Sequence, residues 1–130
     1  MMVVRYGVMI IGQTGSGKTT CYNLLRESLI KIAQDGTDDE RFREVEMFVM
    51  NPKSVSLGEL YGEVDPITND WKHGLASNIM NKCAHRDDEI FKWCIFDGPV
   101  DAVWIENMNT VLDDNMMLCL ANGKRIMLKP

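Results

Sequence analysis

The residues with the clearest chemical potential form a glycine-rich segment near the amino terminus. Three glycines, Gly12, Gly15 and Gly17, are followed directly by Lys18 and Thr19. Glycines allow positive φ angles and let backbone N–H groups approach a phosphate closely, because no Cβ stands in the way. A lysine at this spacing can reach the β- and γ-phosphates, and the hydroxyl after it can ligate Mg²⁺. The pattern Gly-x4-Gly-Lys-Thr is therefore typical of a P-loop.

Every residue of this segment is a predicted nucleotide contact. Backbone amides would surround the phosphates, and a helix that begins near Lys18 would add the positive end of its dipole. Thr20 has a weaker claim, because it could instead pack against or cap the first helical turn. The predicted ligands are ATP or ADP with Mg²⁺, and the predicted binding residues are Gly12, Gln13, Thr14, Gly15, Ser16, Gly17, Lys18, Thr19 and Thr20.

The second half of such a site is predicted where an apolar strand ends. Asp97 follows the run 93–96, and a carboxylate at the end of a neighbouring strand can hold the magnesium shell. Thr19 and Asp97 are thus the predicted magnesium ligands, although an aspartate before a glycine is also a common turn residue. P-loop ATPases of this type continue with a glutamate that orients the attacking water, whereas this chain has Gly98. The sequence predicts a site that binds nucleotide and hydrolyses it poorly, with no catalytic residue.

Alternating strands and helices must position these residues. Apolar runs predict strands over 6–11, 46–51 and 91–96, with the first buried on both faces of a parallel sheet. Helical spacing predicts helices over about 18–33, through 60–61, through 75–83 and from 101 to 112. Ser56 and Glu59 match a capping box, and Asp101 is the expected cap of the last helix. Asn122-Gly123 predicts a two-residue type I′ turn between strands 118–121 and 125–128.

This order of elements favours one architecture. We expect an α/β protein with a three-layer P-loop fold, a truncated parallel sheet of three strands and a C-terminal β-hairpin at about 117–129. The last predicted helix should present Ile105, Met108 and Leu112 on one face.

The composition argues against several classes of partner. Apolar residues make up 45% of the 130 residues, charged residues 25%, and the formal net charge is −5. An acidic chain has no broad basic face to neutralise a nucleic-acid backbone. Its apolar runs fall far short of the roughly 20 residues of a membrane span, and no signal peptide is recognisable. We therefore expect a cytoplasmic protein with no nucleic-acid or membrane partner.

The sulfur-containing and tryptophan residues have a structural interpretation. The four cysteines form no Cys-x-x-Cys pair, so we expect reduced thiols in the core. Cys83 and His85 have no second ligand pair at zinc spacing. The ten methionines and the tryptophans, Trp71, Trp93 and Trp104, are expected in the core or in interdomain contacts.

The motifs also support a resemblance to a known family. The chain resembles the second AAA+ module of axonemal dynein heavy chains, which are microtubule motors with six such modules in a ring. The likeness covers essentially the whole chain and is carried by residues 12–20, Asn51-Pro52-Lys53, Leu60-Tyr61-Gly62, Trp71 and, above all, residues 96–115.

The resemblance implies a nucleotide-holding, regulatory module, with the main hydrolytic site in the first module of the ring. It implies that Gly12, Gly15, Gly17, Lys18 and Thr19 contact the phosphates and Mg²⁺, and that Asp97 is the Walker B acid. Residues 1–130 would be the large α/β subdomain of an AAA+ module, incomplete at its C-terminal side. The implied partners are neighbouring AAA+ modules of the same heavy chain, with microtubules contacted only through other parts of it. The implied location is the cytoskeletal axoneme of a cilium or flagellum.

Two other functions compete with this interpretation. Small P-loop nucleotide or nucleoside kinases also begin with such a loop, and Asp97-Gly98 is similar to their Asp-Gly dipeptide. Those kinases clamp phosphates with clustered arginines, which this sequence lacks after the third predicted strand. A purely structural module with an empty loop is the other alternative, but all three glycines, Lys18 and Thr19 are retained.

The short predicted sheet also leads to an expectation about stability. A parallel sheet needs both faces covered and its edges paired, and an AAA+ module has strands and a helical lid that this sequence does not provide. The lost apolar burial should exceed the roughly 5 to 15 kcal/mol of net stability of a typical domain. We therefore expect these 130 residues to depend on neighbouring modules for their stability.

Overall fold

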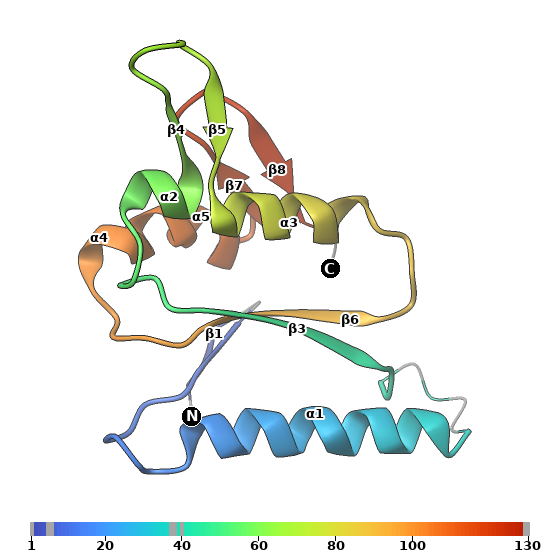
Figure 1. Ribbon diagram of the computed structural model, residues 1–130. Helices are drawn as coiled ribbons and strands as arrows, with labels where there is room; N and C mark the ends of the chain where they lie inside the picture. Colours follow the sequence, from blue (N-terminus) through green and yellow to red (C-terminus); the bar gives the residue numbers. More distant parts are fainter. Residues whose placement is uncertain (1, 5–6, 37–38, 40, 129–130) are drawn as a thin grey trace.

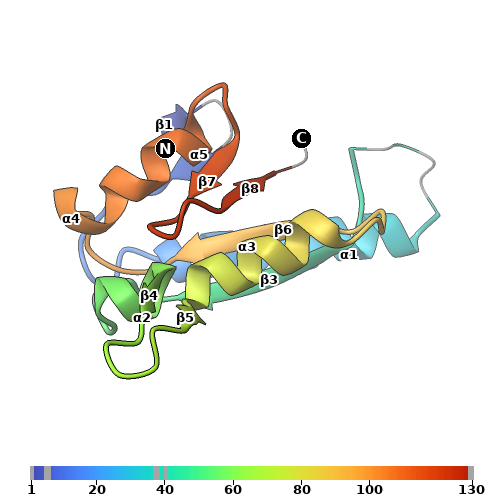
Figure 2. The same ribbon diagram turned by 90° about the horizontal axis from the view of Figure 1, so that it is seen from above.

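The protein folds as an α/β structure around a small parallel sheet. The computed structural model describes residues 2–4, 7–36, 39 and 41–128. In Figure 1, α1 lies on one face of the pair β3–β6, and α3 lies on the other face together with the hairpins β4–β5 and β7–β8. The view from above agrees with this layering (Figure 2). The elements are β1 (Met2–Val4), β2 (Gly7–Met9), α1 (Lys18–Gln34), β3 (Val45–Met50), α2 (Leu57–Tyr61), β4 (Gly62–Val64), β5 (Trp71–His73), α3 (Leu75–His85), β6 (Phe91–Phe96), α4 (Ala102–Ile105), the 3₁₀ helix η1 (Glu106–Met108), α5 (Asn109–Leu112), β7 (Met117–Cys119) and β8 (Arg125–Met127).

The central sheet is a parallel pair formed by two strands that the sequence predicts. β3 pairs with β6 in a register that runs from Val45 opposite Phe91 to Met50 opposite Phe96. The pairing continues one residue further, because the Asp97 N–H donates to the Met50 carbonyl at 2.8 Å. Both strands therefore end at the same edge, which places the residues after Met50 beside Asp97.

The prediction for residues 6–11 is wrong in its pairing. The described part of that run, β2, pairs antiparallel with β1, with Val3 opposite Val8, and does not join the β3–β6 pair. Its apolar side chains are not buried, since Val8 is 58% exposed and Ile11 is 74% exposed. A β-branched run can pair with the residues just before it at a low loop-closure cost, and no local pattern specifies the distant partner instead. Tyr6 lies outside the described residues.

The hydrophobic core lies on the α3 face of the sheet. It joins the end of β3 to α2, α3, the α4–α5 segment and the β7–β8 hairpin. α1, on the other face, contains no buried residue. The buried cluster consists of Met50, Leu60, Tyr61, Ala76, Met80, Trp104, Met108, Val111, Leu118, Leu120 and Ile126.

The predicted capping box is present at the start of α2. The Ser56 hydroxyl accepts from the Glu59 N–H at 3.2 Å, and the Glu59 carboxylate accepts from the Ser56 N–H at 2.8 Å. These two bonds satisfy amides that a helix start leaves unpaired. They fix the entry into a helix that buries Leu60 and Tyr61.

Replacing Ser56 with alanine should lower the free energy of unfolding by about 1 kcal/mol, because the Glu59 N–H loses its acceptor. Chemical denaturation measures this change. Ser28→Ala is the matched control, since Ser28 lies exposed on α1 and donates only to the Leu24 carbonyl one turn earlier. Equal stability of the Ser56 and Ser28 variants would contradict the assigned role of the cap.

The predicted helix after Asp101 is confirmed at its start and differs in its buried face. Asp101 Oδ1 accepts from the N–H groups of Val103 and Trp104 at 3.0 and 3.4 Å. The segment is then divided into α4, η1 and α5. The 3₁₀ turn changes the helical phase, so Trp104, Met108 and Val111 are buried, whereas Ile105 and Leu112 are only partly buried.

The turns of the antiparallel hairpins β4–β5 and β7–β8 are held by side-chain and backbone hydrogen bonds. The β4–β5 hairpin was not predicted, since residues 65–66 indicate only a loop. Asp65 holds it by accepting from the Ile67 N–H at 2.8 Å and by pairing with Lys72 at 2.6 Å. The hydrogen bond from Lys72 is the largest of the effects that lower the pKa of Asp65 to about 2.

The predicted C-terminal hairpin forms with a different turn. β7 pairs antiparallel with β8, and the Gly123 N–H donates to the Leu120 carbonyl at 2.9 Å. Gly123 has φ 81°, but Asn122 is not among the described non-glycine residues with positive φ. The two-residue type I′ prediction is therefore wrong. The turn is type I followed by a left-handed glycine, in which the Asn122 side chain accepts from the Lys124 N–H.

The predicted core positions of sulfur and tryptophan residues are confirmed in part. Met50, Met80, Met108 and Trp104 are buried. Cys21 and Cys119 are exposed free thiols, so the prediction of core thiols is wrong for these two, while Cys83 and Cys94 are half-buried. Cys119 lies between the buried Leu118 and Leu120, so its side chain points to the opposite, exposed side, and Cys21 lies on α1, which contains no buried residue. Within the described ranges, no helix is both long and apolar enough to cross a membrane.

Candidate nucleotide-binding site

The glycine-rich loop connects β2 to the amino terminus of α1. Gly15 and Gly17 have φ angles of 82° and 83°, in the left-handed region that favours glycine. At Gly12 the restriction is steric, because a Cβ there would stand 2.5 Å from the Ser16 hydroxyl oxygen, which would have to move. No side chain caps α1, which begins directly after Gly17. Its first N–H groups and the positive end of its dipole are therefore available to an anion.

Lys18 folds back over the loop that precedes it. Its ammonium group donates to the Gly12 carbonyl at 2.8 Å and to the Gln13 carbonyl at 2.7 Å. The Ser16 N–H also donates to the Gln13 carbonyl at 3.2 Å, which closes the loop. A positive charge is thus held at the mouth of a loop whose glycine backbone is free of side chains, an arrangement suited to a phosphate group.

The structure brings both predicted magnesium ligands to one hydroxyl group. Tyr22 lies on α1 one turn after Thr19, and its hydroxyl donates to Asp97 Oδ2 at 3.1 Å. The Thr19 side chain adjoins the same phenol. Burial raises the pKa of Tyr22, the neighbouring Thr19 side chain lowers it, and the hydrogen bond to Asp97 raises it further. Hydroxyl and carboxylate oxygens are the donors that Mg²⁺ prefers, so the side chains present fit that ion.

The segment after β6 is held in place from several sides. The Trp104 indole N–H donates to the Pro99 carbonyl at 3.1 Å, and its ring stacks on Phe96 with centroids 5.4 Å apart. Asp101 forms an ion pair with Lys53, and the hydrogen bond from Lys53 is the main cause of its lowered pKa. Asp101 thus caps the helix, as predicted, and also pairs with Lys53, which was not predicted. This packing fixes the strand end that carries Asp97.

Gly98 occupies a position with little room for a side chain. A Cβ there would lie 2.5 Å from Asn51 Oδ1 and 3.1 Å from Pro52 Cδ. Asn51 Oδ1 is already the acceptor of the Lys53 N–H at 2.9 Å. A glutamate at this position would therefore displace the Asn51 side chain, which follows β3 at the same edge of the sheet.

The fold does not bring all of the predicted site residues close to Asp97. Gln13, Thr14, Ser16 and Thr20 are exposed, and no side-chain hydrogen bond links them to Asp97 among the described contacts. Tyr22 and Asn51 were not predicted as site residues. Helical spacing places Tyr22 on the same face as Thr19, because positions i and i+3 share a face, but it does not predict the contact with Asp97.

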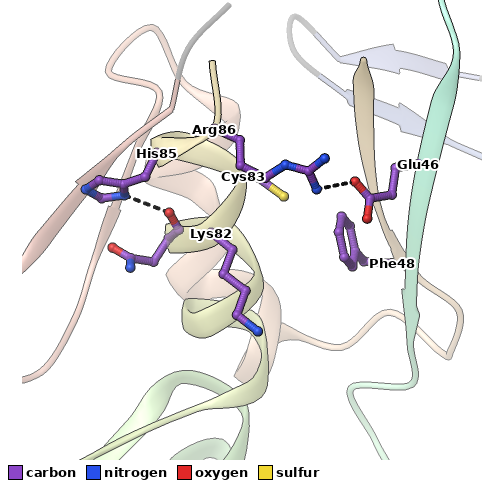
Figure 3. A pocket seen from close by; sticks show the side chains of 7 residues that line it. Glu46, Phe48, Lys82, Cys83, His85 and Arg86 are labelled. Carbon is purple, nitrogen blue, oxygen red and sulfur yellow. Dashed lines mark hydrogen bonds and ion pairs between the residues drawn. The ribbon is translucent and has the colours of Figure 1, made fainter. Parts of the chain in front are cut away.

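A hollow of about 510 Å³ lies elsewhere, between α3 and β3 (Figure 3). Arg86, at the end of α3, forms an ion pair with Glu46 of β3, and His85 Nδ1 lies 2.7 Å from the Asn81 carbonyl oxygen. None of the predicted nucleotide contacts borders this space. Its lining residues are Glu46, Phe48, Asn81, Lys82, Cys83, His85 and Arg86.

Comparison with known proteins identifies the family. No protein-family model matches the chain. Dynein axonemal heavy chain 6 of Homo sapiens is 53% identical over 99% of this chain, and dynein axonemal heavy chain 2 of the same species is 49% identical over 94% of it. The Dynein-1-beta heavy chain, flagellar inner arm I1 complex, of Chlamydomonas reinhardtii is 42% identical over 98% of it.

The match covers only a small part of these relatives. The chain spans about 3% of the length of each of the three. Their names place them in the axoneme, which gives this chain a cytoskeletal, axonemal location. Identities of this size over nearly all of the 130 residues mean that the chain belongs to the axonemal dynein heavy chains and corresponds to one short segment of them.

Proposed function

We propose that this chain binds ATP or ADP with Mg²⁺ through residues 12–20, as a regulatory AAA+ module of a dynein-type microtubule motor. The observation that supports this most is the meeting of Thr19 and Asp97 at the Tyr22 hydroxyl, beside a lysine that covers the glycine loop. A phosphate at the start of α1 would then meet backbone amides, one ammonium group and a metal held by oxygen ligands. In this proposal Lys18 and the loop bind the phosphates, while Thr19 and Asp97 hold the magnesium shell.

The proposed partners are neighbouring AAA+ modules of the same heavy chain, with microtubules bound by other parts of it. A nucleotide held at this position would stabilise one arrangement of the ring and would not itself drive the motor. The relatives' status as dynein heavy chains supports this role over that of a small kinase.

Calorimetric titration of the protein with ADP and with ATP, each with Mg²⁺, tests the proposal. We expect saturable binding of both at one site assigned to this chain. The same samples should transfer no phosphate from ATP to a nucleoside or nucleoside monophosphate, which separates a holding site from a kinase. Absence of binding at millimolar nucleotide would contradict the proposal.

Hydrolysis at this site should be very slow, because no acid follows Asp97 to orient the attacking water. We expect a turnover number well below the roughly 1 to 100 s⁻¹ common for phosphoryl-transfer enzymes. Steady-state phosphate release, with the Lys18→Ala protein as the background, isolates this site's contribution. A turnover within that range, lost in the Lys18→Ala protein, would show that another residue supplies the missing function.

A further inference from the structure

The Tyr22 phenol lies beside both predicted metal ligands and has a single proton to donate. The hydroxyl donates to Asp97 Oδ2 at 3.1 Å, so its oxygen can meet a second partner only as an acceptor. The Thr19 side chain adjoins the phenol and lowers its pKa. A Thr19 hydroxyl that bonds to the phenol oxygen therefore does so as the donor. The phenol thus lies between a hydroxyl on α1 and a carboxylate after β6, which are far apart in sequence.

These hydrogen-bond directions leave an oxygen lone pair of Thr19 and one carboxylate oxygen of Asp97 free for a metal. A threonine hydroxyl that ligates a cation uses an oxygen lone pair and must direct its proton elsewhere, which the Tyr22 oxygen allows. Asp97 accepts from Tyr22 through Oδ2, so Oδ1 remains for the metal or its water shell. Groups hydrogen-bonded to metal ligands orient them, and removing such a partner commonly weakens metal binding about 10- to 100-fold.

We infer that Tyr22 is a positioning residue that orients Thr19 and Asp97 for Mg²⁺, an inference that rests on the proposed nucleotide function. Packing in the hydrophobic core does not explain the position of the Tyr22 hydroxyl group. Tyr22 is half-buried on a helix without buried residues, and its hydroxyl donates to one predicted metal ligand, Asp97, and adjoins the other, Thr19. The other described tyrosine, Tyr61, is buried and donates to the Trp104 carbonyl at 2.5 Å, which is a structural role.

The test compares the ADP affinity of wild type and Tyr22→Phe in EDTA and at a series of Mg²⁺ concentrations. Phenylalanine keeps the ring and removes only the hydroxyl. We expect ADP affinity in EDTA to change less than about twofold, while the apparent Mg²⁺ affinity of the ADP complex falls about 10-fold or more. Mn²⁺, read by its paramagnetic signal, gives a second measure of metal binding. Ser28→Ala, which removes an exposed hydroxyl further along α1, is the matched control, with an unchanged Mg²⁺ affinity.

The outcomes separate this inference from the proposed function. Equal Mg²⁺ affinity in the Tyr22→Phe protein would overturn the inference, and tighter binding would show that the hydroxyl competes with the metal. A wild-type protein that binds no ADP in either condition would overturn the proposed function and this inference with it. In an Asp97→Asn background, Tyr22→Phe should lower the Mg²⁺ affinity less than it does in wild type, because the two side chains act as one unit. Additive losses would contradict the coupling.

Discussion

Replacing Lys18 with alanine should lower the affinity for ATP and ADP by about 100-fold or more. The Lys18 ammonium lies against the Gly12 and Gln13 carbonyls, at the loop where the phosphates are proposed to bind. Two charge-assisted hydrogen bonds to phosphate oxygens, at about 1.5 kcal/mol each, account for a loss of this size. Calorimetric titration with Mg²⁺-ADP measures it.

Lys31→Ala is the matched control for this variant. Lys31 lies exposed in the last turn of α1, thirteen residues further along the helix, or about 20 Å at 1.5 Å per residue. The Lys31→Ala substitution removes the same charge from the same helix without changing the glycine-rich loop. We expect its ADP affinity to equal that of wild type. If both variants lose affinity equally, the effect comes from net charge, and the assignment of Lys18 to the phosphates fails.

Replacing Trp104 with alanine should lower the free energy of unfolding by about 3 to 5 kcal/mol, the range found for buried aromatic residues. Trp104 is 6% exposed, stacks on Phe96 and donates to the Pro99 carbonyl. Its own carbonyl accepts from the buried Tyr61 hydroxyl, so the cavity would lie where α2, β6 and α4 meet. Chemical denaturation measures the change, which would be a large part of the net stability of a domain.

Two further variants test whether the loss of stability comes from the buried Trp104 side chain. Trp104→Phe keeps an aromatic ring against Phe96 and removes the indole N–H. It should therefore lower the free energy of unfolding less than the alanine variant does. Val103→Ala changes a neighbour that is 60% exposed and should alter stability by less than about 0.5 kcal/mol. A Trp104→Ala protein as stable as Val103→Ala would mean that the Phe96–Trp104 contact does not hold the segment after β6.

Local signals predicted the elements whose formation depends on their own residues. The capping box of Ser56 and Glu59, the cap at Asp101 and the apolar runs of β3 and β6 all use interactions within a few residues or a strict periodicity. The helix from Lys18 was predicted to within a residue or two of Gln34 for the same reason. In these segments, the sequence pattern and the final structure obey the same short-range rules.

Pairing between distant segments could not be predicted in the same way. The run that contains β2 has the composition of a buried strand, yet it pairs with β1, and the choice of partner leaves no mark on local spacing. Tyr22 was missed for a related reason. It is an ordinary helical residue until the end of β6 brings Asp97 to its hydroxyl. The loop and both proposed metal ligands follow from motif spacing, whereas the contact between Tyr22 and Asp97 depends on the tertiary fold.

The absence of buried residues from α1 has a consequence for native-state hydrogen exchange. Its Leu24 and Leu25 are 57% and 54% exposed, so opening this helix would release little apolar contact, unlike opening α3 over the core. Segments with few buried contacts open locally at a lower free energy than the whole domain. A ligand that binds only the closed form would slow that opening by mass action. Amide protection along α1 would then report occupancy of the loop, while α3 exchange would report the fold itself.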